Sequence, residues 1–124
     1  MRTLSIDIET FSSVNLLKSG VYAYTESQDF EILLFAYAFD DEEVRIIDFA
    51  KGEKLSGELV DALKDENIIK TAFNAAFERI CLSKHLNTKL HKTVCHFLAL
   101  HTSTIFDGGL ANYFGQGGAS FGRE

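Results

Sequence analysis

Two carboxylates near the N-terminus have the type and spacing to bind a metal ion. Asp7 and Glu9 lie in residues 3–10, TLSIDIET, where apolar and polar residues alternate strictly. This alternation predicts a β-strand that carries both carboxylates on one face, about 7 Å apart. Two anions at this spacing repel each other unless a cation lies between them, and a divalent metal ion is the obvious candidate. The alternative is that both side chains solvate an edge strand.

A third carboxylate, Glu78, is expected to approach this pair. Asn74 is a favoured helix N-cap and good helix formers follow it, so Glu78 lies one turn into a predicted helix. Taken alone, Glu78 is explained by the positive N-terminal end of that helix. Three converging acids without a Lys or Arg among them are costly unless cations bind, and oxygen ligands favour Mg²⁺ or Mn²⁺.

The elements between these residues predict an α/β fold with a mixed sheet. Apolar runs at 30–39 and 44–49 flank a short acidic turn and predict an antiparallel β-hairpin. An amphipathic helix is predicted over 54–64, with Ser56 as a possible cap, followed by a strand over 67–73. A right-handed crossover places that strand parallel to the first, so the helix from Asn74 begins beside the two carboxylates.

The remaining segments are predicted from weaker signals. Residues 11–20 are expected to form a loop with a single helical turn, and residues 91–101 a helix. Asp107 is expected to cap a last short helix that ends near residue 114. Residues 1–115 are predicted to form one domain and the Gly-rich residues 116–124 a flexible tail.

Bulk properties limit the class of protein. The 124 residues carry a formal charge of −6, which argues against a broad basic surface for nucleic acid but allows a small metal-dependent site. Two cysteines form no disulfide framework, and no signal peptide or apolar membrane span is evident. These features predict a reduced, soluble, cytoplasmic protein without a membrane partner.

A second metal site is possible on the following residues. Cys81 and His85, then His91 and Cys95, form two couples four residues apart, a set that could bind zinc. The spacing matches no common zinc-ribbon pattern, and Cys81 also fits the apolar face of its helix as an ordinary core residue.

The acidic motifs resemble those of a known family. Asp7-Ile8-Glu9-Thr10 is similar to the first motif of the DEDD (DnaQ-like) 3′–5′ exonucleases, and Asn74–Glu78 to their second. The resemblance covers about residues 3–115 and is nearest to the N-terminal proofreading domain of phage-type DNA polymerases, including residues 19–24 and 30–39. It implies a ribonuclease-H-like fold, two divalent ions held by Asp7, Glu9 and Glu78, and stepwise hydrolysis at single-stranded DNA 3′ ends.

Four residues of these motifs are candidates for substrate binding. They are Thr10, Phe11, Asn74 and Phe77. The two phenylalanines stand next to the carboxylates and could stack on a base or sugar of a single strand. Core packing is the alternative role for Phe77.

The sequence departs from the family in two respects. Glu78 stands where an Asp is usual, and the third motif, a Tyr or His shortly before an Asp, is not found; His101 and Asp107 are too far apart. The domain is therefore expected to be C-terminally truncated. The alternative to an exonuclease is an inactive metal- or nucleic-acid-binding module, which forms a homodimer or takes a partner chain over the truncated face.

Overall fold

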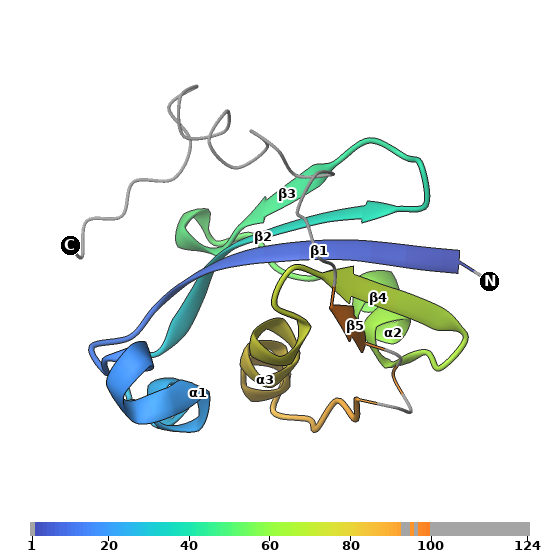
Figure 1. Ribbon diagram of the computed structural model, residues 1–124. Helices are drawn as coiled ribbons and strands as arrows, with labels where there is room; N and C mark the ends of the chain where they lie inside the picture. The colour runs from blue at the N-terminus through green and yellow to red at the C-terminus, as the bar shows by residue number, and fades with distance from the viewer. Residues whose placement is uncertain (1, 93–94, 96, 100–124) are drawn as a thin grey trace.

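A five-stranded mixed sheet with three helices makes up the computed structural model, which describes residues 2–92, 95 and 97–99 (Figure 1). The elements, in chain order, are β1 (Arg2–Phe11), α1 (Leu16–Glu26), β2 (Glu31–Phe39), β3 (Arg45–Asp48), a 3₁₀ turn (Phe49–Lys51), α2 (Gly57–Lys64), β4 (Ile68–Ala72), α3 (Ala75–Leu86) and β5 (Phe97–Ala99). The strand order is β3-β2-β1-β4-β5. The predicted α/β class and mixed sheet are confirmed.

Strand β1 is the centre of this sheet. It pairs antiparallel with β2, which continues through a hairpin into β3, and parallel with β4 on its other side. The predicted hairpin and the predicted position of β4 beside β1 are both confirmed. Parallel β5 then extends the sheet beyond β4.

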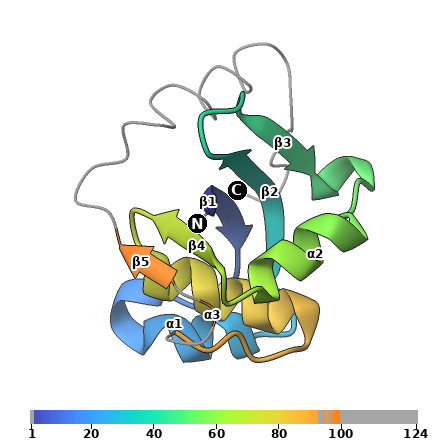
Figure 2. The ribbon, with the colours of Figure 1, turned by 90° about the vertical axis from the view of Figure 1, so that its right-hand side faces the viewer.

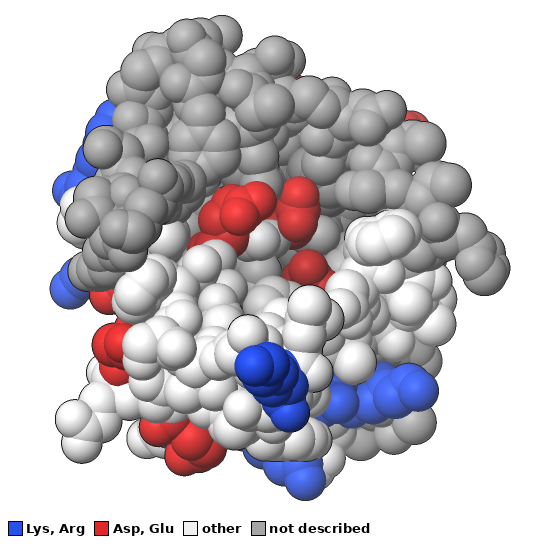
Figure 3. Space-filling model, turned by 60° about the vertical axis from the view of Figure 1, so that its left-hand side comes forward, with Lys and Arg blue, Asp and Glu red and all other residues white. Residues whose placement is uncertain are grey.

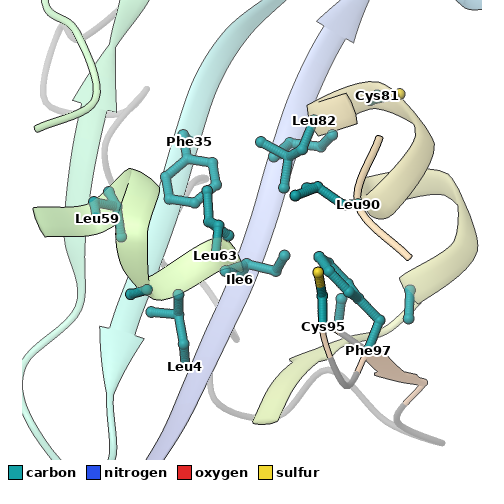
Figure 4. Close-up of a cluster of buried hydrophobic side chains, with 14 of the residues drawn as sticks. Leu4, Ile6, Phe35, Leu59, Leu63, Cys81, Leu82, Leu90, Cys95 and Phe97 are labelled. Atoms are coloured by element: carbon teal, nitrogen blue, oxygen red, sulfur yellow. The ribbon is translucent and has the colours of Figure 1, made fainter. Parts of the chain in front are cut away.

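The apolar side of β1 forms one wall of the core. Leu4, Ile6 and Ile8 are buried in a cluster that includes Leu63 of α2 and Leu82 of α3 (Figure 4). Helices α2 and α3 therefore pack on one side of the sheet, with α1 beside α3 (Figures 1 and 2). Because successive strand residues point to opposite faces, this packing directs the acidic residues of β1 away from the core.

Two helix caps predicted from the sequence are present. The Ser56 hydroxyl accepts a hydrogen bond from the Leu59 amide (3.1 Å) at the start of α2. The Asn74 side chain accepts one from the Phe77 amide (3.4 Å) at the start of α3. Helix α3 ends at Leu86 and is capped by Asn87, whose left-handed conformation (φ 52°) closes the last turn.

Two sequence predictions are wrong. Residues 11–20 were expected to form a loop with a single helical turn, but α1 begins at Leu16 and continues to Glu26, because Asn15 caps the helix and Gly20 (φ 84°) lets the chain kink and continue. Residues 97–99 form β5 where a helix was expected, because pairing with β4 satisfies backbone groups at the exposed edge of that strand. The helix predicted around 107–114, the domain boundary at 115 and the tail lie outside the described residues.

Candidate active site

Asp7 and Glu9 project from the side of β1 that faces away from the helices. Both are half-buried, and their cross-strand neighbours on β2 are the apolar residues Ala36 and Leu34. The β1–β2 register shifts immediately after Glu9, so that Thr10 pairs with Ile32. Such a bulge bends the strand and re-aims the side chains that follow it, which places the end of β1 differently from a regular strand.

Glu78 approaches this region past the end of β4. The last residue of β1 paired with β4 is Ser5, whose partner is Thr71, and their hydroxyls are hydrogen-bonded (3.2 Å). Beyond that pair α3 contacts β1 and carries Glu78 in its first turn, 5% exposed. One carboxylate oxygen, Oε2 of Glu78, is buried and accepts no hydrogen bond from any residue that the structure describes.

The electrostatics couple the three acids. Burial raises the pKa of Asp7, and burial followed by the charge of Asp7 raises the pKa of Glu9. Burial raises the pKa of Glu78 to about 8, with the charge of Asp7 as a smaller contribution. Asp7 therefore acts on both other carboxylates, and each ionised form lacks a compensating positive charge.

The three acids do not form a closed set of metal ligands. Within residues 2–92, 95 and 97–99, no three His, Cys, Asp or Glu side chains lie close enough together to hold an ion by themselves. Figure 3, which brings the α1 side of the molecule forward, shows acidic side chains gathered in a hollow without Lys or Arg between them.

The chemistry of these donors nevertheless fits a hard divalent cation. The donors are all carboxylate oxygens, one of them buried without a partner in the described part of the chain, and a cation would lower all three raised pKa values. Mg²⁺ is commonly bound through one or two carboxylates and keeps several waters, so an open arrangement suits it better than a complete protein cage.

The alternative zinc site is not formed. The four residues considered for it lie in the described part of the chain, where no such ligand group occurs. Cys81 and Cys95 belong to the buried core, and burial raises the pKa of Cys81 to about 12, so its thiol stays protonated. His85 lies against the Phe49 ring, with 4.8 Å between the centroids. The zinc hypothesis is therefore wrong for this structure.

The substrate-binding candidates have structural contacts of their own. Asn74 caps α3, and half-buried Phe77 packs against the core, the alternative considered for it. The Thr10 hydroxyl is hydrogen-bonded to the Tyr24 hydroxyl (2.8 Å). Phe11 is the last residue of β1 and is half-buried. These contacts place all four residues next to the acids along β1 and α3 and leave their role towards substrate as a prediction.

Tyr24 of α1 is a residue that the sequence analysis missed. It is buried, it bonds to Thr10, and its ring lies 6.0 Å from that of Phe77 and 5.8 Å from that of Phe30. It thus joins the end of β1 to the start of α3. The two tyrosines within residues 21–24 were the available signal, but the sequence analysis assigned no helix or strand to this segment.

Comparison with known proteins relates the chain to a polymerase. No family model matches. Over 105 residues the chain is 60% identical to a DNA polymerase of Bacillus phage SP02, and the match covers 85% of this chain and 16% of that protein. The chain is therefore related to a segment of a phage DNA polymerase and spans about a sixth of that protein's length.

One solved structure provides a comparison of the fold alone. A chain in the structure of the yeast NOT1 MIF4G domain co-crystallized with CAF1 matches with a TM-score of 0.50 and 12% identity, over 97% of this chain and 70% of that one. Separately, no helix in the described part of the molecule is long and apolar enough to cross a membrane.

Proposed function

We propose that this chain is a metal-dependent 3′–5′ exonuclease domain of a polymerase-related protein, acting on DNA 3′ ends. The observation that carries the proposal is the shared environment of Asp7, Glu9 and Glu78, whose raised pKa values reflect burial without a counter-charge. The relation to a phage DNA polymerase supports the same class of substrate. The mixed sheet, with an antiparallel hairpin and a parallel strand around β1, supports a ribonuclease-H-like fold.

The three carboxylates would hold Mg²⁺ or Mn²⁺. Bound ions of this kind activate a water and stabilise the leaving oxygen in phosphodiester hydrolysis. The protein supplies the half-buried carboxylates of β1 and the desolvated carboxylate of Glu78, which faces weaker competition from solvent than an exposed acid does.

The neighbouring side chains would position the strand. Tyr24 restrains Thr10 through the hydroxyl pair at 2.8 Å, so the segment after Glu9 is held against α1. Phe11 follows directly and would stack on a terminal base, a contact that tolerates any base because every base has an aromatic face. Phe77 supports this arrangement from the core side through its contact with Tyr24.

The proposal is tested by nucleotide release from a 3′-labelled single-stranded oligonucleotide with Mn²⁺. The wild type should release mononucleotides, and Asp7→Asn, which keeps the shape and removes the charge, should abolish release. Asp61→Asn on the exposed surface of α2 is the matched control and should retain full activity. Equal background release by wild type and Asp7→Asn would refute the catalytic assignment.

The lack of a preformed three-ligand group in the described residues weighs against two-metal turnover, and so it favours a second candidate function without catalysis. In that case the chain binds metal ions or nucleic acid without turnover and assembles with itself or a partner chain. Calorimetry would then show Mn²⁺ binding that Asp7→Asn abolishes, although no nucleotide is released. Light scattering that reports a monomer at every concentration would contradict self-assembly.

A further inference from the structure

An open groove of about 490 Å³ lies between α1 and the C-terminal half of α3. Its α1 wall includes Tyr22 and Glu26, and its other wall includes Arg79 and Lys84 of α3 and Lys89 just beyond the helix. Three of the chain's 12 basic residues therefore meet in one groove of a protein whose formal charge is −6. We propose that this groove binds the phosphate backbone of a single nucleic-acid strand, an inference that rests on the proposed nucleic-acid substrate.

The charges in the groove are available to a ligand. Lys84 is 46% exposed and its Nζ lies 3.6 Å from Glu26, itself 71% exposed, so solvent screens this ion pair and the pair is weak. Lys89 is exposed. One N–H of Arg79 donates to the Leu90 carbonyl (3.1 Å), which restrains the guanidinium beside the groove that it helps to line.

An exposed aromatic ring accompanies these cations. Tyr22 is a large aromatic side chain on the exposed side of α1 and is 67% exposed. A basic groove next to an exposed aromatic is the combination by which proteins hold single strands, the cations on phosphates and the ring on a base. An acidic peptide would form ion pairs with the lysines and the arginine but has no base to stack on the Tyr22 ring. A single nucleic-acid strand makes both kinds of contact and is therefore the better fit.

The groove and the candidate active site are both built on α1 and α3. Arg79 follows Glu78 in α3, and Lys84 lies about 1.4 turns beyond Arg79, about 7.5 Å along the axis. On the other wall, Tyr22 precedes the buried Tyr24 that bonds to Thr10. Lys and Arg side chains lie on the same face as the acidic hollow and apart from it (Figure 3). We therefore expect a strand with its 3′ end at the acids to extend over the surface where α1 and α3 meet.

The groove is tested by fluorescence anisotropy with labelled oligo-dT and the full chain, in EDTA to prevent cleavage. Three phosphate contacts predict that the wild-type affinity falls about 15–20-fold between about 50 and 200 mM salt, because counterion release scales with the contacts. Lys84→Ala with Lys89→Ala should reduce that fall to about 2–3-fold and weaken binding at low salt. Glu26→Gln should tighten binding, since it removes the opposing charge beside Lys84.

Lys54→Ala with Lys64→Ala is the matched control, because it removes the same charge from exposed positions outside the groove and should leave the salt dependence unchanged. Equal weakening by both pairs would overturn the groove as a site. Competition by poly-glutamate as effective as that by oligo-dT would overturn its assignment to nucleic acid.

The groove and the nuclease proposal can fail separately. Oligo-dT binding that depends on Lys84 and Lys89, without any Mn²⁺-dependent release, would support the groove and refute the exonuclease. Release with an unchanged KM in the double variant would support the exonuclease and refute the groove.

Discussion

The buried carboxyl group of Glu78 makes the stability of the metal-free protein depend on pH. Its pKa is raised from 4.5 to about 8, because burial penalises the charged form. Between these values the folded protein keeps a proton that the unfolded chain has released. The free energy of unfolding therefore falls as the pH rises through this window.

Glu78→Gln removes this dependence while it keeps the shape of the side chain. A tenfold change in proton affinity corresponds to about 1.4 kcal/mol, so the raised pKa sets an upper limit of about 5 kcal/mol on the stability that the wild type loses by pH 8. We expect the variant and the wild type to unfold at similar temperatures at pH 5. At pH 8 the variant should be more stable by a few kcal/mol, or about 10 °C for a domain of this size.

The measurement is thermal unfolding followed by circular dichroism, from pH 5 to 8.5 in EDTA and again with Mn²⁺. Mn²⁺ should raise the unfolding temperature of the wild type at pH 8, because the ion compensates the carboxylate charge. The same concentration of Mn²⁺ should raise the unfolding temperature of Glu78→Gln less. Glu58→Gln, in the first turn of α2 and exposed, is the matched control and should show no pH-dependent gain. A Glu78→Gln variant less stable than wild type at both pH values would refute the reasoning.

Three further substitutions test the surrounding contacts. Tyr24→Phe removes the hydroxyl that meets Thr10, so it should cost about 1 kcal/mol of stability and raise the KM for oligonucleotide; an unchanged KM would contradict its positioning role. Ser56→Ala should cost about 1 kcal/mol in urea unfolding, because it removes the cap on Leu59, and no loss would show that the cap contributes nothing. Burial lowers the pKa of Lys70, so wild-type stability should rise as the pH nears 10.5, and Lys70→Met should abolish that rise; an unchanged rise would contradict this account.

The strand and helix that carry the three acids could be predicted, because the sequence patterns that define them are local. The alternation over residues 3–10 determines which side of β1 is apolar, and so it puts Asp7 and Glu9 together on the other side. Asn74 starts α3 through its own side chain, which sets Glu78 one turn from the helix end. These features depend on neighbours a few residues apart.

Helix α1, strand β5 and the burial of Glu78 depend on contacts between segments that are distant in the sequence. Helix α1 is held by Tyr24, which meets Thr10 and Phe77 across the fold, and no local pattern reports that contact. Strand β5 exists because β4 offers it an edge to pair with. Burial of Glu78 likewise depends on the packing of α3 against β1. The sequence by itself therefore determined the order and spacing of the candidate acids, and only the tertiary structure decided how far burial raises their pKa values.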